Sequence, residues 1–274
     1  YGPVLTHGSL TPLQMLQMLD CFDPVGSDQA IYWHRLAEVA KLAWRDRLLY
    51  LADPAFVNVP VERLLSPEYA RGRVESLLQV PHTVDRSHDG ISGKAHTQTL
   101  HVSAADVEGN VVSMTITQGG EFGSCFTVPG TGIILGHGMC RLDPNPGLAN
   151  SVAAGKRPLN NGCPLLVRTA DRDVAIGVPG GRRIVCVATM MAQQLVDFEA
   201  TSLQVARSPR LHVVTEEPVE ILDTMDGDIV AGLRKIGHDV EVVDWICGNA
   251  HGAEVLKAEG SVRAGGNGWA AAAE

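Results

Sequence analysis

The sequence predicts an α+β fold, in which helices and antiparallel strands occupy different stretches of one chain. Apolar residues recur with a helical period in the first fifty residues, whereas strict alternation runs from Leu100 to Ala105 and again from Val112 to Thr117. Short strands and helices then alternate between residues 201 and 274. The length of 274 residues suits one large domain or two small ones.

The N-terminal region predicts two long helices. The run LQMLQMLDCF is typical of a helix that Pro24 and Gly26 bring to an end. From Ile31 to Leu51 the apolar residues fall on one helical face. The segment 86–96, RSHDGISGKAH, is rich in Ser, His and Gly, and we expect it to form an exposed, mobile loop.

A β-hairpin follows this loop. Alternating residues predict two strands joined by the turn at 107–109, whose Gly suits the left-handed position of a three-residue hairpin. If Asp106 faces Asn110, the register places Thr99 directly opposite Thr117 with both side chains on one face. The two hydroxyl groups would then lie close together.

Thr99 begins a strand directly after a flexible loop. Hydrolases with an N-terminal Thr generate that residue by cutting their own chain, and the freed α-amine activates the hydroxyl. A loop-to-strand junction suits such a cut. On position alone, however, a β-branched residue that simply starts a strand is the commoner case.

Gly180 and Gly181 lie between a predicted strand, VAIGV, and a helix that begins near Arg182. Glycines at such a junction expose backbone N–H groups, and the helix start adds a positive dipole end, so the pair could hold a developing oxyanion. An ordinary strand-to-helix turn is the alternative.

Composition narrows the class of function. The net charge of −9 does not support nucleic-acid binding, and no apolar run approaches the roughly 20 residues of a membrane-spanning helix. The six cysteines lack CxxC spacing and the ten histidines lack HxxxH or HExxH spacing, so we expect neither a metal site nor an organic cofactor. A small-molecule substrate fits best. The chain starts at Tyr1 without a signal peptide, which suggests a fragment and favours the cytoplasm.

Four segments together resemble the γ-glutamyltranspeptidase family. Residues 37–60, AEVAKLAWRDRLLYLADPAFVNVP, are similar to the end of the family's large subunit, and residues 99–117, TLHVSAADVEGNVVSMTIT, to the start of its small subunit. GKRPLNNGCPLLV (155–167) and GVPGGRRI (177–184) resemble the family's K-R-P-L-S-S-M-S-P and G-S-P-G-G-S-R-I. The motifs occur in the family's order.

This resemblance implies the four-layer αββα sandwich of the N-terminal-nucleophile hydrolases, with antiparallel sheets. It implies cleavage between Gln98 and Thr99, so that residues 1–98 are the C-terminal part of the large subunit and residues 99–274 the small, catalytic subunit. Thr99 is then the nucleophile, Thr117 its supporting Thr, and Gly180 with Gly181 the oxyanion pair. The N-terminal half of the large subunit, in the same or another polypeptide, would be the protein partner.

The residues that bind the glutamyl group in the family are not kept. Gly119 replaces an Asn, Gly138 and Arg141 replace polar and acidic residues of N-N-Q-M-D-D, and Asn160-Asn161 replace the Ser-Ser pair. Arg141 reverses a charge, so a substrate ammonium group would be repelled there.

We therefore expect an autoprocessing Thr-nucleophile hydrolase or acyltransferase that cleaves an amide or a related acyl bond of a non-standard substrate. Relatives with remodelled pockets include cephalosporin acylases, oxamate amidohydrolases and antibiotic-biosynthesis enzymes that hydrolyse a C–C bond. A true γ-glutamyl hydrolase or transpeptidase acting on glutathione-like compounds and an inactive structural homologue remain the alternatives.

Overall fold

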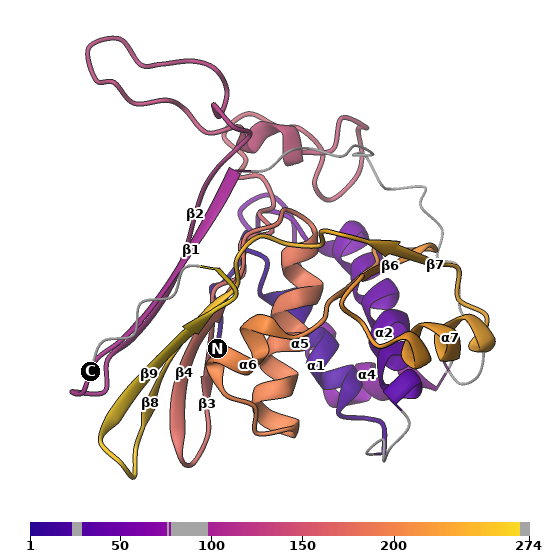
Figure 1. Ribbon diagram of the computed structural model, residues 1–274. Helices are drawn as coiled ribbons and strands as arrows, with labels where there is room; N and C mark the ends of the chain where they lie inside the picture. The colour runs from indigo at the N-terminus through magenta and orange to yellow at the C-terminus, as the bar shows by residue number, and fades with distance from the viewer. Residues whose placement is uncertain (24–28, 76, 78–97, 269–274) are drawn as a thin grey trace.

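A computed structural model describes residues 1–23, 29–75, 77 and 98–268 (Figure 1). The helices are Leu10–Leu19 (α1), Gln29–Tyr50 (α2), Val61–Leu64 (α3), Pro67–Val74 (α4), Arg183–Asp197 (α5), Ser202–Arg207 (α6) and Gly227–Ile236 (α7), with a 3-10 turn (η1) at Gly138–Arg141. The strands are Gln98–Ala105 (β1), Val111–Gly119 (β2), Leu165–Arg168 (β3), Arg172–Gly177 (β4), Leu211–His212 (β5), Val219–Leu222 (β6), Val240–Val243 (β7), His251–Leu256 (β8) and Ser261–Gly266 (β9).

Two antiparallel sheets lie against each other. One is the β1–β2 hairpin, and the other has the order β3-β4-β8-β9. The hydroxyl of Ser113 on β2 donates to the carbonyl of Ile176 on β4 at 2.8 Å, so polar side chains of the hairpin contact the second sheet directly. In Figure 1 the hairpin lies beside this sheet, on the side away from the helices.

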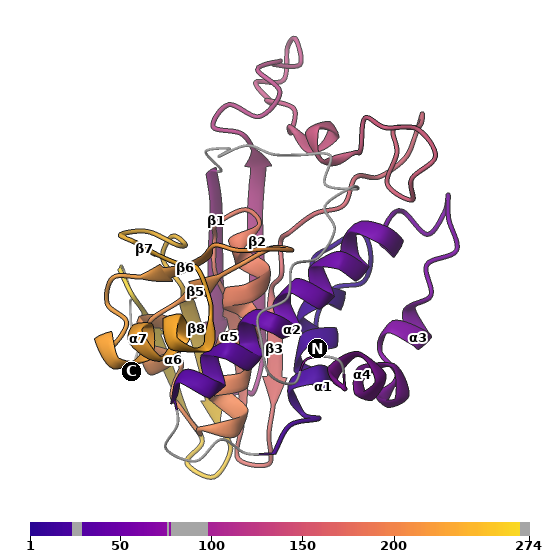
Figure 2. The same cartoon turned by 90° about the vertical axis from the view of Figure 1, so that its right-hand side faces the viewer.

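A helical layer covers the other face of the four-stranded sheet. Helix α5 places one apolar side against the sheet, where it packs with Val174, Ile176 and Val178 in a shared core. Its remaining buried residues join a second core with α1 and α2, and Figure 2 shows α1 and α4 beside α2. This layer fixes β4, and with it the Gly-rich turn that follows.

A third sheet, β5-β6-β7, shares a core with α2 and α5 and contains one parallel pair, β6 with β7, beside the expected antiparallel pairing. Helix α7 makes the crossover that a parallel pair requires. Its N-cap is Asp226, whose side chain accepts from the N–H of Asp228, and its C-cap is Gly237 with φ 118°.

The predicted elements of the N-terminal region and the hairpin are confirmed. Helices α1 and α2 match the two apolar patterns, and the turn closes through the N–H of Asp106 on the carbonyl of Asn110 at 3.1 Å, with Gly109 at φ 93°. Thr99 pairs with Thr117 as the register required. Pro24, Gly26 and the loop 86–96 lie outside the described residues.

The described chain contains three of the four expected layers: two facing sheets and one helical layer. The outer face of the hairpin bears apolar side chains that are exposed within the described part of the chain. They are Leu100, Val102, Val112, Met114 and Ile116. No described helix covers them.

Candidate active site

Thr99 lies at the point where the hairpin pairing becomes irregular. From Thr99 to Ala105 the register with β2 is continuous, but between Gln98 and Thr99 it shifts, so that Gln98 pairs with Gly119. A shift of this kind frees the peptide unit from a regular ladder. The Thr99 side chain is only 8% exposed and faces the second sheet. The predicted cleavage position therefore coincides with a break in strand pairing.

The hydroxyl of Thr99 donates to that of Thr117 across the hairpin at 3.0 Å. The Thr117 oxygen also accepts from the N–H of Gly119 at 2.9 Å, which fixes its position. Because both Thr side chains come from paired strand positions, the contact follows directly from the register. The arrangement holds the Thr99 oxygen in one orientation.

Gly119 ends β2, and the segment that leads into η1 packs closely against it. Its φ is +89°, and a Cβ there would lie 3.2 Å from the Cβ of His137. The N–H of His137 donates to the carbonyl of Gln118 at 2.6 Å, so the segment that leads into η1 rests on the end of β2. Glycine is thus required by backbone conformation and by this close approach.

His101 continues the polar inner face of the hairpin. Its ring nitrogens contact the hydroxyls of Thr115 and Ser103, each at 3.0 Å, and the ring packs on Gly177 at the end of β4. Burial, with a smaller contribution from His251, lowers the pKa of His101 to about 4. His101 is therefore neutral near pH 7 and serves to hold the two strands on the second sheet.

The contacts between the hairpin and β4 indicate where Thr99 lies relative to the glycine pair. Ser113, opposite Ser103, contacts Ile176, and His101 contacts Gly177, so the step from Ser103 toward Thr99 follows β4 toward Gly180. Thr99 and Gly180-Gly181 thus belong to the same end of the facing sheets.

Gly180 and Gly181 have φ angles of +155° and +63°, which favour glycine, and a Cβ at Gly180 would collide with the Sγ of Cys247 at 2.5 Å. No partner for either N–H appears among the described residues. Helix α5 begins two residues later, at Arg183. Two available N–H groups at a helix start can stabilise a negative oxygen.

Asn160 and Asn161 are held by a buried Arg that the sequence analysis did not single out. Arg47 Nη2 on α2 donates to the Asn160 carbonyl and to Asn161 Oδ1, both at 3.0 Å. A Cβ at the adjacent Gly162 would lie 3.6 Å from the methyl group of Thr115, so the Asn pair lies close to the hairpin. The sequence signal for Arg47 was its place in the W-R-D-R run of a matched motif.

Positive charge gathers on this side of the site. Burial lowers the pKa of Arg47 to about 10, and the charges of Arg182 and Arg141 act in the same direction. Arg141 ends η1, and a Cβ at Gly138 in the same turn would lie 3.2 Å from Pro158. Arg182 and Arg141 thus lie within electrostatic reach of Arg47.

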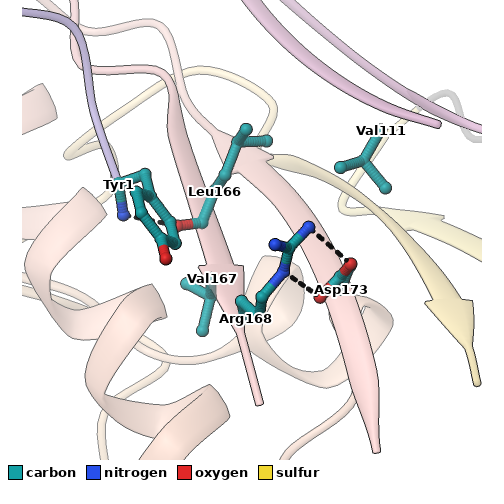
Figure 3. A pocket seen from close by; sticks show the side chains of 6 residues that line it. All are labelled: Tyr1, Val111, Leu166, Val167, Arg168 and Asp173. Carbon is teal, nitrogen blue, oxygen red and sulfur yellow. Dashed lines mark hydrogen bonds and ion pairs between the residues drawn. The ribbon is translucent and has the colours of Figure 1, made fainter. Parts of the chain in front are cut away.

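A separate pocket of about 280 Å³ lies between Tyr1, β3 and β4 (Figure 3). It includes Val111, which pairs with Ala105 at the opposite end of the hairpin from Thr99. It is not part of the candidate site. No described helix is long and apolar enough to cross a membrane.

The facing antiparallel sheets and their helical layer have the architecture of an N-terminal-nucleophile hydrolase. Residues 1–274 match the model of the family described as gamma-glutamyltranspeptidase. The chain belongs to the γ-glutamyltranspeptidase family, whose members are hydrolases and transferases.

Curated relatives include acylases and glutathione hydrolases. The Acylase ACY 1 proenzyme of Pseudomonas sp. (strain SE83) is 38% identical over 233 residues, which cover 83% of this chain and 41% of the relative. The Glutathione hydrolase proenzyme of Bacillus subtilis (strain 168) is 30% identical over 255 residues, covering 86% and 43%. The chain therefore spans about two fifths of the length of these relatives.

Solved structures agree with the fold. Cephalosporin acylase from Bacillus halodurans superposes with a TM-score of 0.85 at 24% identity, covering 96% of this chain and 48% of that one. A variant of the protein LmbA2991 superposes with a TM-score of 0.81 at 25% identity, covering 97% and 52%. Both likenesses extend over nearly the whole chain.

Proposed function

We propose that the protein is an autoprocessing Thr-nucleophile hydrolase or acyltransferase whose substrate carries an anionic or aromatic acyl group in place of the γ-glutamyl group. The observation that carries this proposal is the hydrogen bond between Thr99 and Thr117 at the register shift. It gives one hydroxyl a fixed orientation beside a peptide bond that is released from regular pairing.

Maturation would start from the Thr99 hydroxyl. Its oxygen attacks the carbonyl carbon of Gln98, the C–N bond breaks, and the acyl group moves from nitrogen to oxygen as an ester. Water then cleaves that ester, which leaves a carboxylate on Gln98 and a free α-amine on Thr99. Residues 1–98 and 99–274 would thereby become parts of two chains.

Catalysis would use the same hydroxyl. The α-amine of Thr99 accepts its proton, the oxygen attacks the substrate carbonyl, and the N–H groups of Gly180 and Gly181 hold the negative oxygen of the tetrahedral intermediate. The leaving group departs with a proton and an acyl ester remains on Thr99. Water or an acceptor amine then releases the acyl group.

The choice of substrate class rests on charge. Arg141 replaces an acidic residue of the family pattern, and Arg47 and Arg182 add positive potential. A carboxylate or an electron-rich ring can pair with guanidinium groups, whereas these groups would repel a free α-ammonium.

A second protein segment would complete the site. Homologous proenzymes supply large and small subunits from one precursor. The exposed apolar outer face of β1 and β2 is the surface that such a segment would bury, and it would supply the fourth layer of the sandwich.

A matched pair of anilides tests the substrate class, since γ-glutamyl-p-nitroanilide and glutaryl-p-nitroanilide differ only in the α-amine. We expect the full-length protein to hydrolyse the glutaryl compound with at least about tenfold higher kcat/KM, an energy difference of about 1.4 kcal/mol. Preference for the glutamyl compound would instead support a true γ-glutamyl hydrolase, the function that the glutathione hydrolase relatives favour.

Intact mass distinguishes an inactive homologue from both kinds of active enzyme. Rapid quenching of an active enzyme during turnover leaves an acyl adduct on the peptide that begins at Thr99. A Thr131→Ala variant is the matched control and should form the same adduct, because Thr131 is an exposed loop residue. Absence of any adduct or turnover with a wide panel of acyl compounds would remove the enzymatic proposal.

A further inference from the structure

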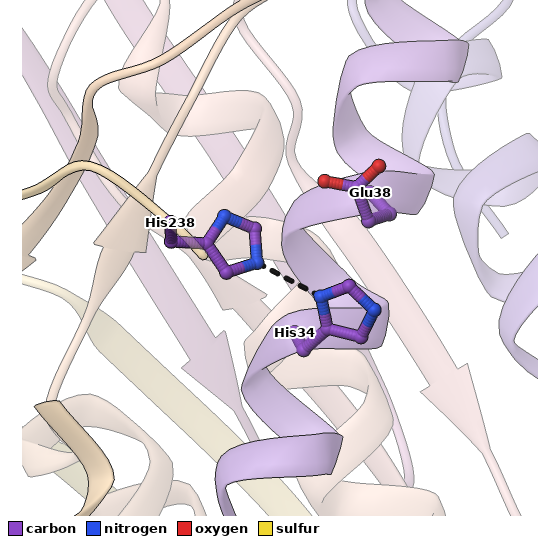
Figure 4. A group of neighbouring side chains, drawn as sticks. All are labelled: His34, Glu38 and His238. Atoms are coloured by element: carbon purple, nitrogen blue, oxygen red, sulfur yellow. Dashed lines mark hydrogen bonds between the residues drawn. The ribbon is translucent and has the colours of Figure 1, made fainter. Parts of the chain in front are cut away.

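Two histidines and a glutamate converge in the core away from the candidate active site (Figure 4). His34 and Glu38 lie one turn apart on α2, and His238 follows α7 at the entry to β7. Their exposed fractions are 7%, 1% and 4%, and one donor atom from each lies within 4.8 Å of the other two. In the part of the chain that the structure describes, this is the one group of His, Cys, Asp and Glu donors that meets this distance.

Glu217 sets the orientation of His238. Its Oε1 lies 2.7 Å from His238 Nδ1, and because a carboxylate only accepts, Nδ1 is the donor of this contact. The other nitrogen, Nε2, lies 2.8 Å from His34 Nδ1. A carboxylate that holds the far nitrogen of a histidine is the usual outer partner of a metal-binding imidazole.

Lys41 links the two carboxylates of the group. The fully buried ammonium of Lys41 contacts Glu38 Oε1 at 2.7 Å and Glu217 Oε1 at 2.6 Å. The same ammonium therefore fixes the positions of Glu38, one of the three donors, and of Glu217, the partner of His238.

We propose that His34, Glu38 and His238 bind a zinc ion, with Glu217 as the outer partner of His238. Two imidazole nitrogens and one carboxylate oxygen suit Zn²⁺, and water would complete a four-coordinate site. Binding needs both facing nitrogens, His34 Nδ1 and His238 Nε2, to be without a proton and to move apart from 2.8 Å to about 3.4 Å, which follows from Zn–N bonds of about 2.0–2.1 Å.

The ion would join α2 to the link between α7 and β7. Helix α2 also carries Arg47, which holds the Asn160-Asn161 segment. The site is therefore structural and does not depend on the proposed reaction. A search of the sequence for paired histidines does not find it, because His34 and His238 are 204 positions apart.

Metal content and cobalt spectra of the full-length protein test the proposal. We expect about one zinc per chain after purification without added metal, and a Co²⁺ derivative whose visible bands identify tetrahedral coordination. His238→Gln should weaken Zn²⁺ binding more than about 100-fold, and Glu217→Gln about 10- to 100-fold. His7→Gln is the matched control, because His7 is exposed and outside the group.

Measurement on the unsubstituted protein keeps the test independent of how well the variants fold. After dialysis against a chelator, titration with Zn²⁺ should give a dissociation constant below about 1 μM and a higher Tm. No zinc in the purified protein and no binding in the titration would overturn the proposal and leave a hydrogen-bonded histidine pair.

Discussion

The two sides of the candidate site differ in how they are built. On one side Thr99, Thr117 and the Gly180-Gly181 turn are held by strand register and by close packing against His101 and Cys247. On the other side, residues 119–161 are mostly irregular, and they hold the positions at which the sequence analysis predicts that glutamate-binding residues are replaced. Register and tight packing tolerate little change, whereas loops accept new side chains at small cost. The reacting groups and the specificity groups can therefore change separately.

The glycine turn offers the largest expected effect on the reacting side. Gly181→Ala places a Cβ at φ +63° and tilts the N–H groups, and we expect a roughly 100- to 1000-fold loss in kcat, the range seen when one oxyanion donor is removed. Gly132→Ala is the matched control, because Gly132 has φ +70° with open space around it. Similar losses of kcat in both variants would attribute the effect to backbone strain alone.

Substitutions at Thr117 and Thr115 distinguish the orientation of the Thr99 hydroxyl from the packing of the hairpin. Thr117→Val keeps the shape and removes the contact with Thr99, so single-turnover rates should fall roughly 10- to 100-fold, for a hydrogen bond of about 1–3 kcal/mol. Thr115→Val removes the contact with His101 one pair further along the strand. Thr115→Val should lower Tm, and its single-turnover rate should fall less than that of Thr117→Val. An unchanged rate in Thr117→Val would refute the catalytic use of the register.

A substitution at Arg141 tests whether residues 119–161 determine which substrate binds. Arg141→Asp should raise KM for the glutaryl anilide about tenfold or more and leave kcat nearly unchanged, because the guanidinium acts in binding. Glutamyl activity should not return, since Asn160 and Asn161 still shape the carboxylate position. Steady-state kinetics on both anilides measure this. Full glutamyl activity in this variant would mean that one charge determines specificity.

The last effect concerns the pH dependence of stability and leaves the reaction itself aside. Burial holds the pKa of His101 at about 4 against 6.5 in the unfolded chain, so its contribution to stability is complete above about pH 6.5 and falls as the pH drops to about 4. The loss is at most about 3 kcal/mol. Comparing urea unfolding of wild type and His101→Gln over this pH window isolates it. Equal pH slopes would contradict the buried, neutral state of His101.

The sequence was sufficient where one local rule determines the structure. Alternation and the turn at Gly109 predicted the Thr99–Thr117 pair, and the apolar period predicted α1 and α2. Contacts between distant segments could not be predicted in this way. Arg47 meets Asn161 across 114 positions, and the parallel β6–β7 pair depends on the α7 crossover. No local pattern encodes such contacts. The role of each site residue stays a prediction.

The N-terminus of the mature small chain tests the central claim most directly. Intact mass and N-terminal sequencing of the full-length gene product should show a chain that begins at Thr99. Thr99→Ala should stay uncut and inactive, whereas Thr99→Ser, which keeps a hydroxyl, should still be cut. A Thr99→Ala protein that matures and turns over substrate at the wild-type rate would contradict the account.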